Sequence, residues 1–281
     1  MLSSPSREPT RAAPPAHPGP LLRDWRQRRR LSQMALALDV GISPRHLSFV
    51  ETGRARPSAQ LVLALAERLA LPLRERNRLL LSGGYAPRFT QRPLAAPDMQ
   101  PVHQALERLL AAHQPFPGLV LDRCWNVVLA NPAALGLAAL LPEALRGPPL
   151  NILRASLHPD GFARFTRNFD DWAGHLLAAL GRSLDASADA ALQALDDEVR
   201  AYPNVQALLR RGGPQAAPAS AALVLPCVLA LPQGELSLFT TLASFGTPRD
   251  VTLDELCIEL FYPADAATEA RLRQAAAGAP T

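Results

Sequence analysis

Hydrogen-bonding side chains between residues 33 and 56 are spaced in a way that suits nucleic acid recognition. Arg45 can make a bidentate contact with O6 and N7 of guanine, and His46 or Ser48 can reach a base edge or a phosphate. Gln33 is placed to hold a phosphate together with nearby backbone N–H groups. The candidate DNA contacts are Gln33, Ser43, Pro44, Arg45, His46, Ser48, Phe49, Arg54 and Arg56.

Short helices joined by a tight turn must position these side chains. Good N-caps and apolar residues at helical spacing predict three helices, over 33–39, 44–52 and 59–69, after Ser32, Ser43 and Ser58. Gly41 supplies the sharp turn between the first two. This arrangement can place the helix that begins at Pro44 in the major groove of DNA, whose width admits one α-helix.

Two further helices, over 21–30 and 74–81, complete a predicted five-helix bundle. Its core is expected to take Leu47 and Val50 from the third helix, with Ala35, Leu36, Leu38 and Val40 from the second. An acidic side chain facing phosphate would be repelled. We therefore expect Glu51 to pair with an arginine or to cap a nearby turn.

Three motifs of this segment resemble the xenobiotic-response-element (XRE) type of helix-turn-helix family. They are Leu31-Ser-Gln33, Val40-Gly-Ile-Ser43 and Glu51-Thr-Gly-Arg-Ala-Arg-Pro-Ser58. The resemblance implies a compact helical DNA-binding domain that usually acts as a dimer on a two-fold-related operator. A sequence-specific transcription regulator is the expected function.

The net charge differs in sign between the two parts of the chain. Residues 21–92 contain 14 arginines and five acidic residues, a net charge of +9, whereas residues 93–281 carry a net charge of −6. The chain has no lysine, so its bases are all arginines. A basic module beside an acidic one fits a protein that binds phosphate with only its first part.

Composition predicts the domain limits and the compartment. Residues 1–20 contain six prolines and are expected to form a disordered tail. The remaining predicted parts are the helix-turn-helix domain at 21–92, a linker at 93–101, a second domain at 102–273 and a disordered tail at 274–281. The chain shows neither a signal-peptide pattern nor an apolar run long enough to cross a membrane, so a cytoplasmic location without a membrane partner is expected.

The second domain has a mixed pattern of strands and helices. A hairpin is predicted from strands at 118–122 and 126–130, a helix precedes it at 102–113, and residues 150–211 are mainly helical. Three strands follow at 222–231, 235–243 and 255–262. Together these elements predict an α+β, PAS-like domain in which helices cover one side of an antiparallel sheet of about five strands.

Further motifs resemble the MmyB-like ligand-binding family. They are His113-Gln-Pro-Phe-Pro117, Leu121-Asp-Arg-Cys-Trp-Asn126, Ala130-Asn131, Leu157-His-Pro-Asp-Gly161, Phe245-Gly-Thr-Pro-Arg-Asp-Val-Thr252 and, across the two domains, Leu73-Arg-Glu-Arg-Asn77 with Gly83-Gly-Tyr-Ala-Pro87. The resemblance implies a PAS-like domain that binds a small, mainly apolar molecule of fatty-acid-like type. Pro132 departs from the family's pattern.

Residues that could meet such a ligand are aromatic or polar. The aromatic candidates can equally be residues of the hydrophobic core, and the polar ones can be buried groups whose hydrogen bonds are made within the protein. The candidate ligand contacts are Trp125, Asn126, Asn131, His158, Phe165, Trp172, His175, Phe239 and Phe261.

Two functions for the second domain remain open. Either a ligand there biases the geometry of a homodimer and so its grip on the operator, or the domain serves only dimerisation or a partner protein. An enzyme is not expected, because the chain has no Gly-rich phosphate loop, paired metal ligands or nucleophile elbow. The same pattern predicts neither a metal nor a cofactor.

Overall fold

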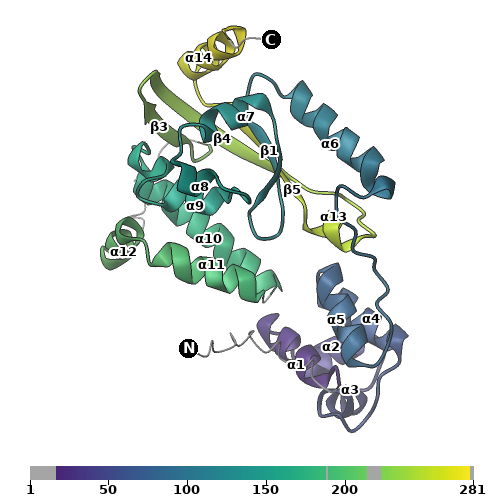
Figure 1. Cartoon of the computed structure of the whole chain (residues 1–281). Coiled ribbons are helices and arrows are strands. Elements are labelled where there is room, and N and C mark those ends of the chain that lie inside the picture. Colours follow the sequence, from purple (N-terminus) through teal and green to yellow (C-terminus); the bar gives the residue numbers. More distant parts are fainter. Residues whose placement is uncertain (1–16, 188, 214–222, 279–281) are drawn as a thin grey trace, which may run out of the picture. The chain divides into compact units, whose positions relative to one another are not determined.

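The computed structural model describes residues 17–187, 189–213 and 223–278, and the chain divides into two compact units, Met1–Thr90 and Gln91–Thr281. Figure 1 shows the helical first unit and the mixed second unit. Residues 1–16 of the predicted tail lie outside the described residues. The last two residues of the predicted tail, Gly19 and Pro20, instead begin the first helix. Pro20 fits there because a proline in the first turn of a helix costs no hydrogen bond.

The first unit is a bundle of five helices, as predicted. They are α1 (Gly19–Arg28), α2 (Gln33–Asp39), α3 (Pro44–Glu51), α4 (Ala59–Arg68) and α5 (Leu73–Ser82).

Serine side chains start three of these helices. The hydroxyl of Ser32 accepts a hydrogen bond from the N–H of Ala35 at 3.0 Å, and Ser43 and Ser58 cap α3 and α4 in the same way. Each such cap contributes about 1 kcal/mol. Gly41 lies in the turn between α2 and α3 with φ +72°, a left-handed conformation that favours glycine. The predicted helix-turn-helix geometry is confirmed.

The core of the first unit corrects one prediction. Leu47 and Val50 are fully buried, as expected, but Leu38 is 67% exposed. The buried residues of α2 are Leu36 and Ala37. A residue two positions after Leu36 points to the opposite side of a helix, so Leu38 faces away from the core.

One buried carboxylate connects three helices of the first unit. Glu51, at the end of α3, receives hydrogen bonds from Arg26 Nε at 2.6 Å and from Arg26 Nη2 at 2.9 Å. Gln33 Nε2 in α2 donates to the same carboxylate at 2.7 Å. The hydrogen bond to Glu51 raises the pKa of Arg26 above its ordinary value, although burial opposes this. The structural role predicted for Glu51 is confirmed.

The second unit contains five strands and nine α-helices among its described residues. Its elements are η1 (Pro97–Met99), α6 (Gln100–Ala112), β1 (Gly118–Leu121), β2 (Val127–Ala130), α7 (Pro132–Ala138), α8 (Glu143–Arg146), α9 (Ile152–Leu157), η2 (Phe162–Arg164), α10 (Phe169–Ser187), α11 (Ala190–Arg200), α12 (Pro203–Arg210), β3 (Cys227–Leu231), β4 (Gly234–Ala243), α13 (Val251–Glu255), β5 (Cys257–Pro263) and α14 (Ala266–Ala277).

The five strands form one antiparallel sheet in the order β2-β1-β5-β4-β3, which confirms the predicted sheet. Helices cover both of its faces (Figure 1), so the prediction of helices on one side was wrong. Leu106 and Leu110 of α6 pack with Val120 and Ile258 on one face. The other face packs against helices that include α7 and α10. Every residue of β1 is buried, as expected of a strand covered on both sides.

Several segments of the second unit differ from their predicted limits. Helix α6 begins inside the predicted linker, and α14 continues to Ala277, beyond the predicted domain end at 273. The predicted helical region at 150–211 is divided into several helices: Phe162 lies in η2, and α10 begins only at Phe169. The predicted strand that began at residue 222 starts at Cys227 in the structure, and residue 222 lies outside the described residues.

The outer edge of β3 is covered by the segment at 165–168. Arg167 N donates to the carbonyl of Val228 at 2.8 Å, and Ala230 N donates to the carbonyl of Phe165 at 2.8 Å. The amide of Asn168 accepts from Val228 N at 3.0 Å. Irregular backbone and one side chain therefore take the place of a sixth strand.

No helix among the residues that the structure describes is long and apolar enough to cross a membrane.

Removing one partner of the buried ion pair should destabilise the first unit. In Glu51→Leu the guanidinium of Arg26 stays buried without its carboxylate, so we expect the free energy of unfolding to fall by about 3–5 kcal/mol. Hydrogen exchange of α2 and α3 in the full chain would measure this loss. Glu67→Leu, at an exposed site on α4, is the control and should change it by less than about 0.5 kcal/mol. Equal protection in both variants would contradict the role of Glu51.

Candidate functional site

The outer side of α3 carries the side chains that could read DNA. Arg45 is exposed, and its guanidinium lies over the ring of Phe49, 5.4 Å from the centroid. His46 and Ser48 are half-buried on the same helix, and Pro44 occupies its first turn. Most of the predicted base-reading residues therefore share one short helix, and Arg45 is the most accessible of them.

Three of the predicted DNA contacts also have roles within the first unit. Gln33 donates to Glu51, and the Ser43 oxygen accepts from His46 N at 3.1 Å. Arg56 donates to the carbonyl of Gly83 at 2.9 Å and lies over the ring of Tyr85. Arg56 thus ties the loop after α3 to the end of α5. Arg54, in the same loop, is exposed.

An apolar cavity of about 70 Å³ lies in the second unit, between the sheet and the helices that pack on it. Most of its wall consists of aliphatic and aromatic side chains, which include Leu119, Trp125, Phe162, Trp172, Leu229 and Phe261.

The structure brings three of the five predicted aromatic contacts to this cavity. Trp125, Trp172 and Phe261 line it, whereas Phe165 packs against the adjacent core. Phe239 does not line the cavity. Neighbouring strand residues point to opposite faces of a sheet, and Leu238 takes the position that faces the cavity. Phe239 instead stacks on Tyr262, with ring centroids 5.5 Å apart.

None of the four predicted polar contacts lines the cavity. Asn131 is fully engaged by backbone groups: its Oδ1 accepts from Gly118 N and Ala134 N, and its amide donates to two carbonyls. It therefore caps α7, with Pro132 in the first turn. His158 accepts from Asp160 N at 3.1 Å, and His175 is exposed and stacks on Trp172.

The fourth polar candidate, Asn126, belongs to a hydrogen-bonded turn between β1 and β2. Asp122 accepts from Cys124 N at 2.8 Å, from Asn126 N at 2.9 Å and from the Asn126 amide at 3.0 Å. Asn151 donates to Cys124 O and to Asn126 Oδ1, which ties the turn to the start of α9. These bonds hold Trp125 in the left-handed region, at φ +65°, which is unfavourable for a bulky residue.

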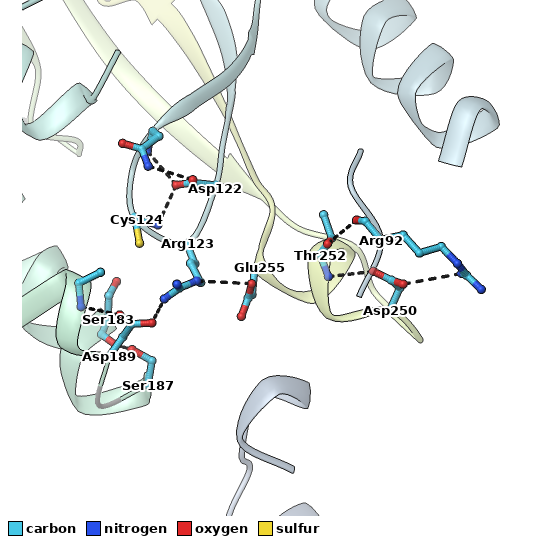
Figure 2. A network of polar contacts seen from close by, with 12 residues as sticks. Arg92, Asp122, Arg123, Cys124, Ser183, Ser187, Asp189, Asp250, Thr252 and Glu255 are labelled. Carbon is cyan, nitrogen blue, oxygen red and sulfur yellow. Dashed lines mark hydrogen bonds and ion pairs between the residues drawn. The ribbon is translucent and has the colours of Figure 1, made fainter. Parts of the chain in front are cut away.

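The polar network around this turn reaches other parts of the second unit (Figure 2). Arg123 forms ion pairs with Asp189, which caps α11, and with Glu255 at the end of α13, where Nε and Oε2 are 3.8 Å apart.

At the start of α13, the network continues to Arg92. The Thr252 hydroxyl donates to Arg92 O at 2.6 Å, and the Arg92 guanidinium lies 3.7 Å from a carboxylate oxygen of Asp250. These contacts connect α13 with the first residues of the second unit.

The sequence interpretation missed a carboxyl group at the cavity. Glu259 in β5 lines the cavity and is 6% exposed, and burial raises its pKa to about 7 despite a hydrogen bond from Thr240. Cys227 lines the same cavity, and burial raises the pKa of its thiol to about 12. A signal for Glu259 was present, because it stands two residues before Phe261 and so shares the inward face of the strand.

No group of three or more potential metal ligands occurs within the described ranges. The cavity wall itself is largely hydrocarbon and contains one acidic side chain, that of Glu259.

Comparison with known families gives two matches. A model described as a helix-turn-helix domain matches residues 19–79. A model described as the MmyB-like transcription regulator ligand binding domain matches residues 102–275, more than half of the chain. Both are families of transcription regulators and not of enzymes. No curated protein is significantly similar to the chain.

The raised pKa of Glu259 should make stability depend on pH. Between pH 4.5 and 7 the folded protein binds more protons at this residue than the unfolded chain, so its contribution to the free energy of unfolding falls as pH rises. Relative to the wild type, Glu259→Gln should therefore gain about 3 kcal/mol between pH 4.5 and pH 8.

Urea unfolding at several pH values would measure this difference. Glu143→Gln makes the same change at an exposed site on α8 and should parallel the wild type. Parallel profiles for Glu259→Gln as well would show that Glu259 does not titrate near neutrality.

Proposed function

The chain belongs to the family of MmyB-like transcription regulators, and from this we propose that a small, mainly apolar ligand in its second unit changes how its first unit binds an operator. The helix-turn-helix domain and the ligand-binding domain together make the chain a transcription regulator. The apolar cavity in the unit that carries the ligand-binding domain is the observation that supports the ligand most directly.

On DNA, α3 lies in the major groove and Arg45 contacts a guanine, while Arg54 and the exposed side of Gln33 contact phosphates. The buried pair of Arg26 and Glu51 supports this assignment, because it fixes the start of α2 and the end of α3 relative to α1. The chain acts as a homodimer, in which two copies of α3 meet half-sites about one helical turn apart.

The size of the cavity limits the ligand. One water-sized group needs about 10–15 Å³ of such a volume, so a cavity of about 70 Å³ holds roughly five to seven of them. A chain of roughly six carbons fits this space. A longer fatty-acid-like molecule requires some of the lining side chains to move.

The turn between β1 and β2 carries the effect of the ligand away from the cavity. Trp125 touches the cavity, and Arg123 in the same turn binds Glu255 of α13. The other end of α13 holds Arg92, two residues after the first unit ends at Thr90. A ligand that shifts Trp125 would thus alter contacts at the chain segment that leads to the DNA-binding unit.

Native mass spectrometry of the purified full chain tests the ligand. We expect the mass of a dimer with a bound small molecule, which denaturing extraction then releases. A domain that serves only dimerisation or a partner protein would show the dimer without a small molecule and without a change in thermal stability after extraction.

Two arginine variants should affect DNA binding in different ways. Arg45→Ala should cost about 1–3 kcal/mol at one operator position and relax the preference there, because it removes a base contact. Arg54→Ala should weaken binding to all sequences alike and lower the salt dependence by about one counterion. Binding to operators selected from genomic fragments measures both. Arg23→Ala, an exposed change on α1, serves as the control, and unchanged discrimination in Arg45→Ala would refute the base contact.

Loss of Arg123 should separate ligand binding from the DNA response. Arg123→Gln removes the ion pairs to Asp189 and Glu255 but leaves the cavity wall intact. We expect the affinity for a probe such as hexan-1-ol to change by less than about threefold, while the effect of the probe on operator affinity, typically about 5–150-fold in allosteric proteins, disappears. Arg211→Gln, which breaks an exposed ion pair with Asp170, should keep the response. A full response in Arg123→Gln would exclude this route.

A further inference from the structure

Glu259 is an unusual residue to find in the wall of an apolar cavity. It lies in the middle of β5, opposite Leu119 of β1 and Leu242 of β4. Side chains from four strands and three α-helices, among them Ala134 and Trp172, make the rest of the wall largely hydrocarbon. An ionised carboxylate buried among such groups costs folding free energy unless a partner compensates for it.

The described part of the protein offers Glu259 little compensation. None of the ion pairs among those residues includes Glu259, and its hydrogen bond comes from the neutral hydroxyl of Thr240. The titratable groups that interact with it are two thiols, Cys227 of β3 and Cys257 of β5, and neither carries a positive charge. The carboxyl oxygens of Glu259 can therefore still accept hydrogen bonds from a molecule that enters the cavity.

We propose that Glu259 accepts a hydrogen bond from the ligand, so that the cavity selects a compact apolar molecule with a hydroxyl or amine group over a carboxylic acid of equal length. This inference rests on the proposed ligand-sensing function and specifies the chemistry of the ligand. A carboxylate ligand would place a second negative charge beside Glu259 in a medium of low polarity, which is unfavourable. A donor group satisfies the buried carboxyl instead.

The aromatic side chains of the wall favour the same class of ligand. Trp125 and Trp172 both line the cavity. The face of a tryptophan ring attracts an ammonium group, and it does not disfavour a hydroxyl group. The apolar remainder of the ligand is then held by the aliphatic side chains.

Protonation of Glu259 makes the headgroup preference depend on pH. Burial raises the pKa of Glu259 to about 7, so the carboxylate fraction grows about tenfold between pH 6 and pH 8. The affinity for an amine, which needs the carboxylate, should rise by the same factor. The affinity for a carboxylate should fall, and that for an alcohol should change least.

Three six-carbon probes test this selectivity on the full chain. Hexan-1-ol, hexylamine and hexanoate share the same chain, and isothermal titration calorimetry at pH 6 and pH 8 compares their headgroups. At pH 8 we expect the wild type to bind the alcohol and the amine at least about tenfold more tightly than the acid. Glu259→Gln should lose the pH dependence for hexylamine and about tenfold of its affinity, and it should bind hexanoate more tightly than the wild type does. Glu143→Gln should behave as the wild type.

A second variant keeps the test informative if Glu259→Gln alters folding. Thr240→Val removes the hydrogen bond that favours the ionised form of Glu259, so the pH at which hexylamine binding reaches half its maximum should move upward.

The outcomes separate this inference from the proposed function. Equal binding of the three probes, unaffected by either variant, would overturn the role of Glu259 and leave a ligand-binding cavity. Absence of binding by all three probes to the wild type would overturn both.

Discussion

The left-handed backbone of Trp125 is the constraint on which the cavity and the polar network both depend. Such a conformation costs a bulky residue about 1–3 kcal/mol and persists only where the surroundings determine it fully. Here Asp122 and Asn151 supply the determining hydrogen bonds. The resulting turn places an indole in the cavity wall while Arg123 reaches Asp189 and Glu255. One strained turn of the chain thus joins the apolar site to the charged surface around it.

In the first unit, a single buried carboxylate fixes the arrangement of three helices. Glu51 holds Arg26 and Gln33, so that α1, α2 and α3 meet at one buried group. A buried ion pair is weak evidence for stability, but its directional hydrogen bonds can define one arrangement of helices. Because α3 is fixed in this way, the exposed Arg45 projects from a rigid element. Precise positioning of a base-reading side chain requires such support.

Local signals in the sequence predicted much of this organisation. Ser32, Ser43 and Ser58 start helices because a cap needs only the next three residues, and Gly41 turns because its own backbone allows it. Contacts between residues that are far apart in the sequence were not predicted. The side-chain amide of Asn126 is bonded to the side chains of Asp122 and Asn151, and that of Asn131 is bonded to backbone groups. Glu259 becomes a cavity residue only when β1, β4 and β5 assemble. Residue type alone does not distinguish a hydrogen-bonded hub from a ligand contact.

The covered edge of β3 restricts how two copies of the chain can associate. An uncovered edge strand can pair with the same strand of another molecule and so extend a sheet across a dimer. In this protein the outward C=O of Val228 already accepts a hydrogen bond from Arg167 N, and its N–H already donates to the Asn168 side chain. Association through a continuous sheet at β3 would require the segment at 165–168 to detach first. A dimer that keeps this segment in place meets the β3 edge through side chains, and such contacts can slide or tilt without breaking backbone hydrogen bonds.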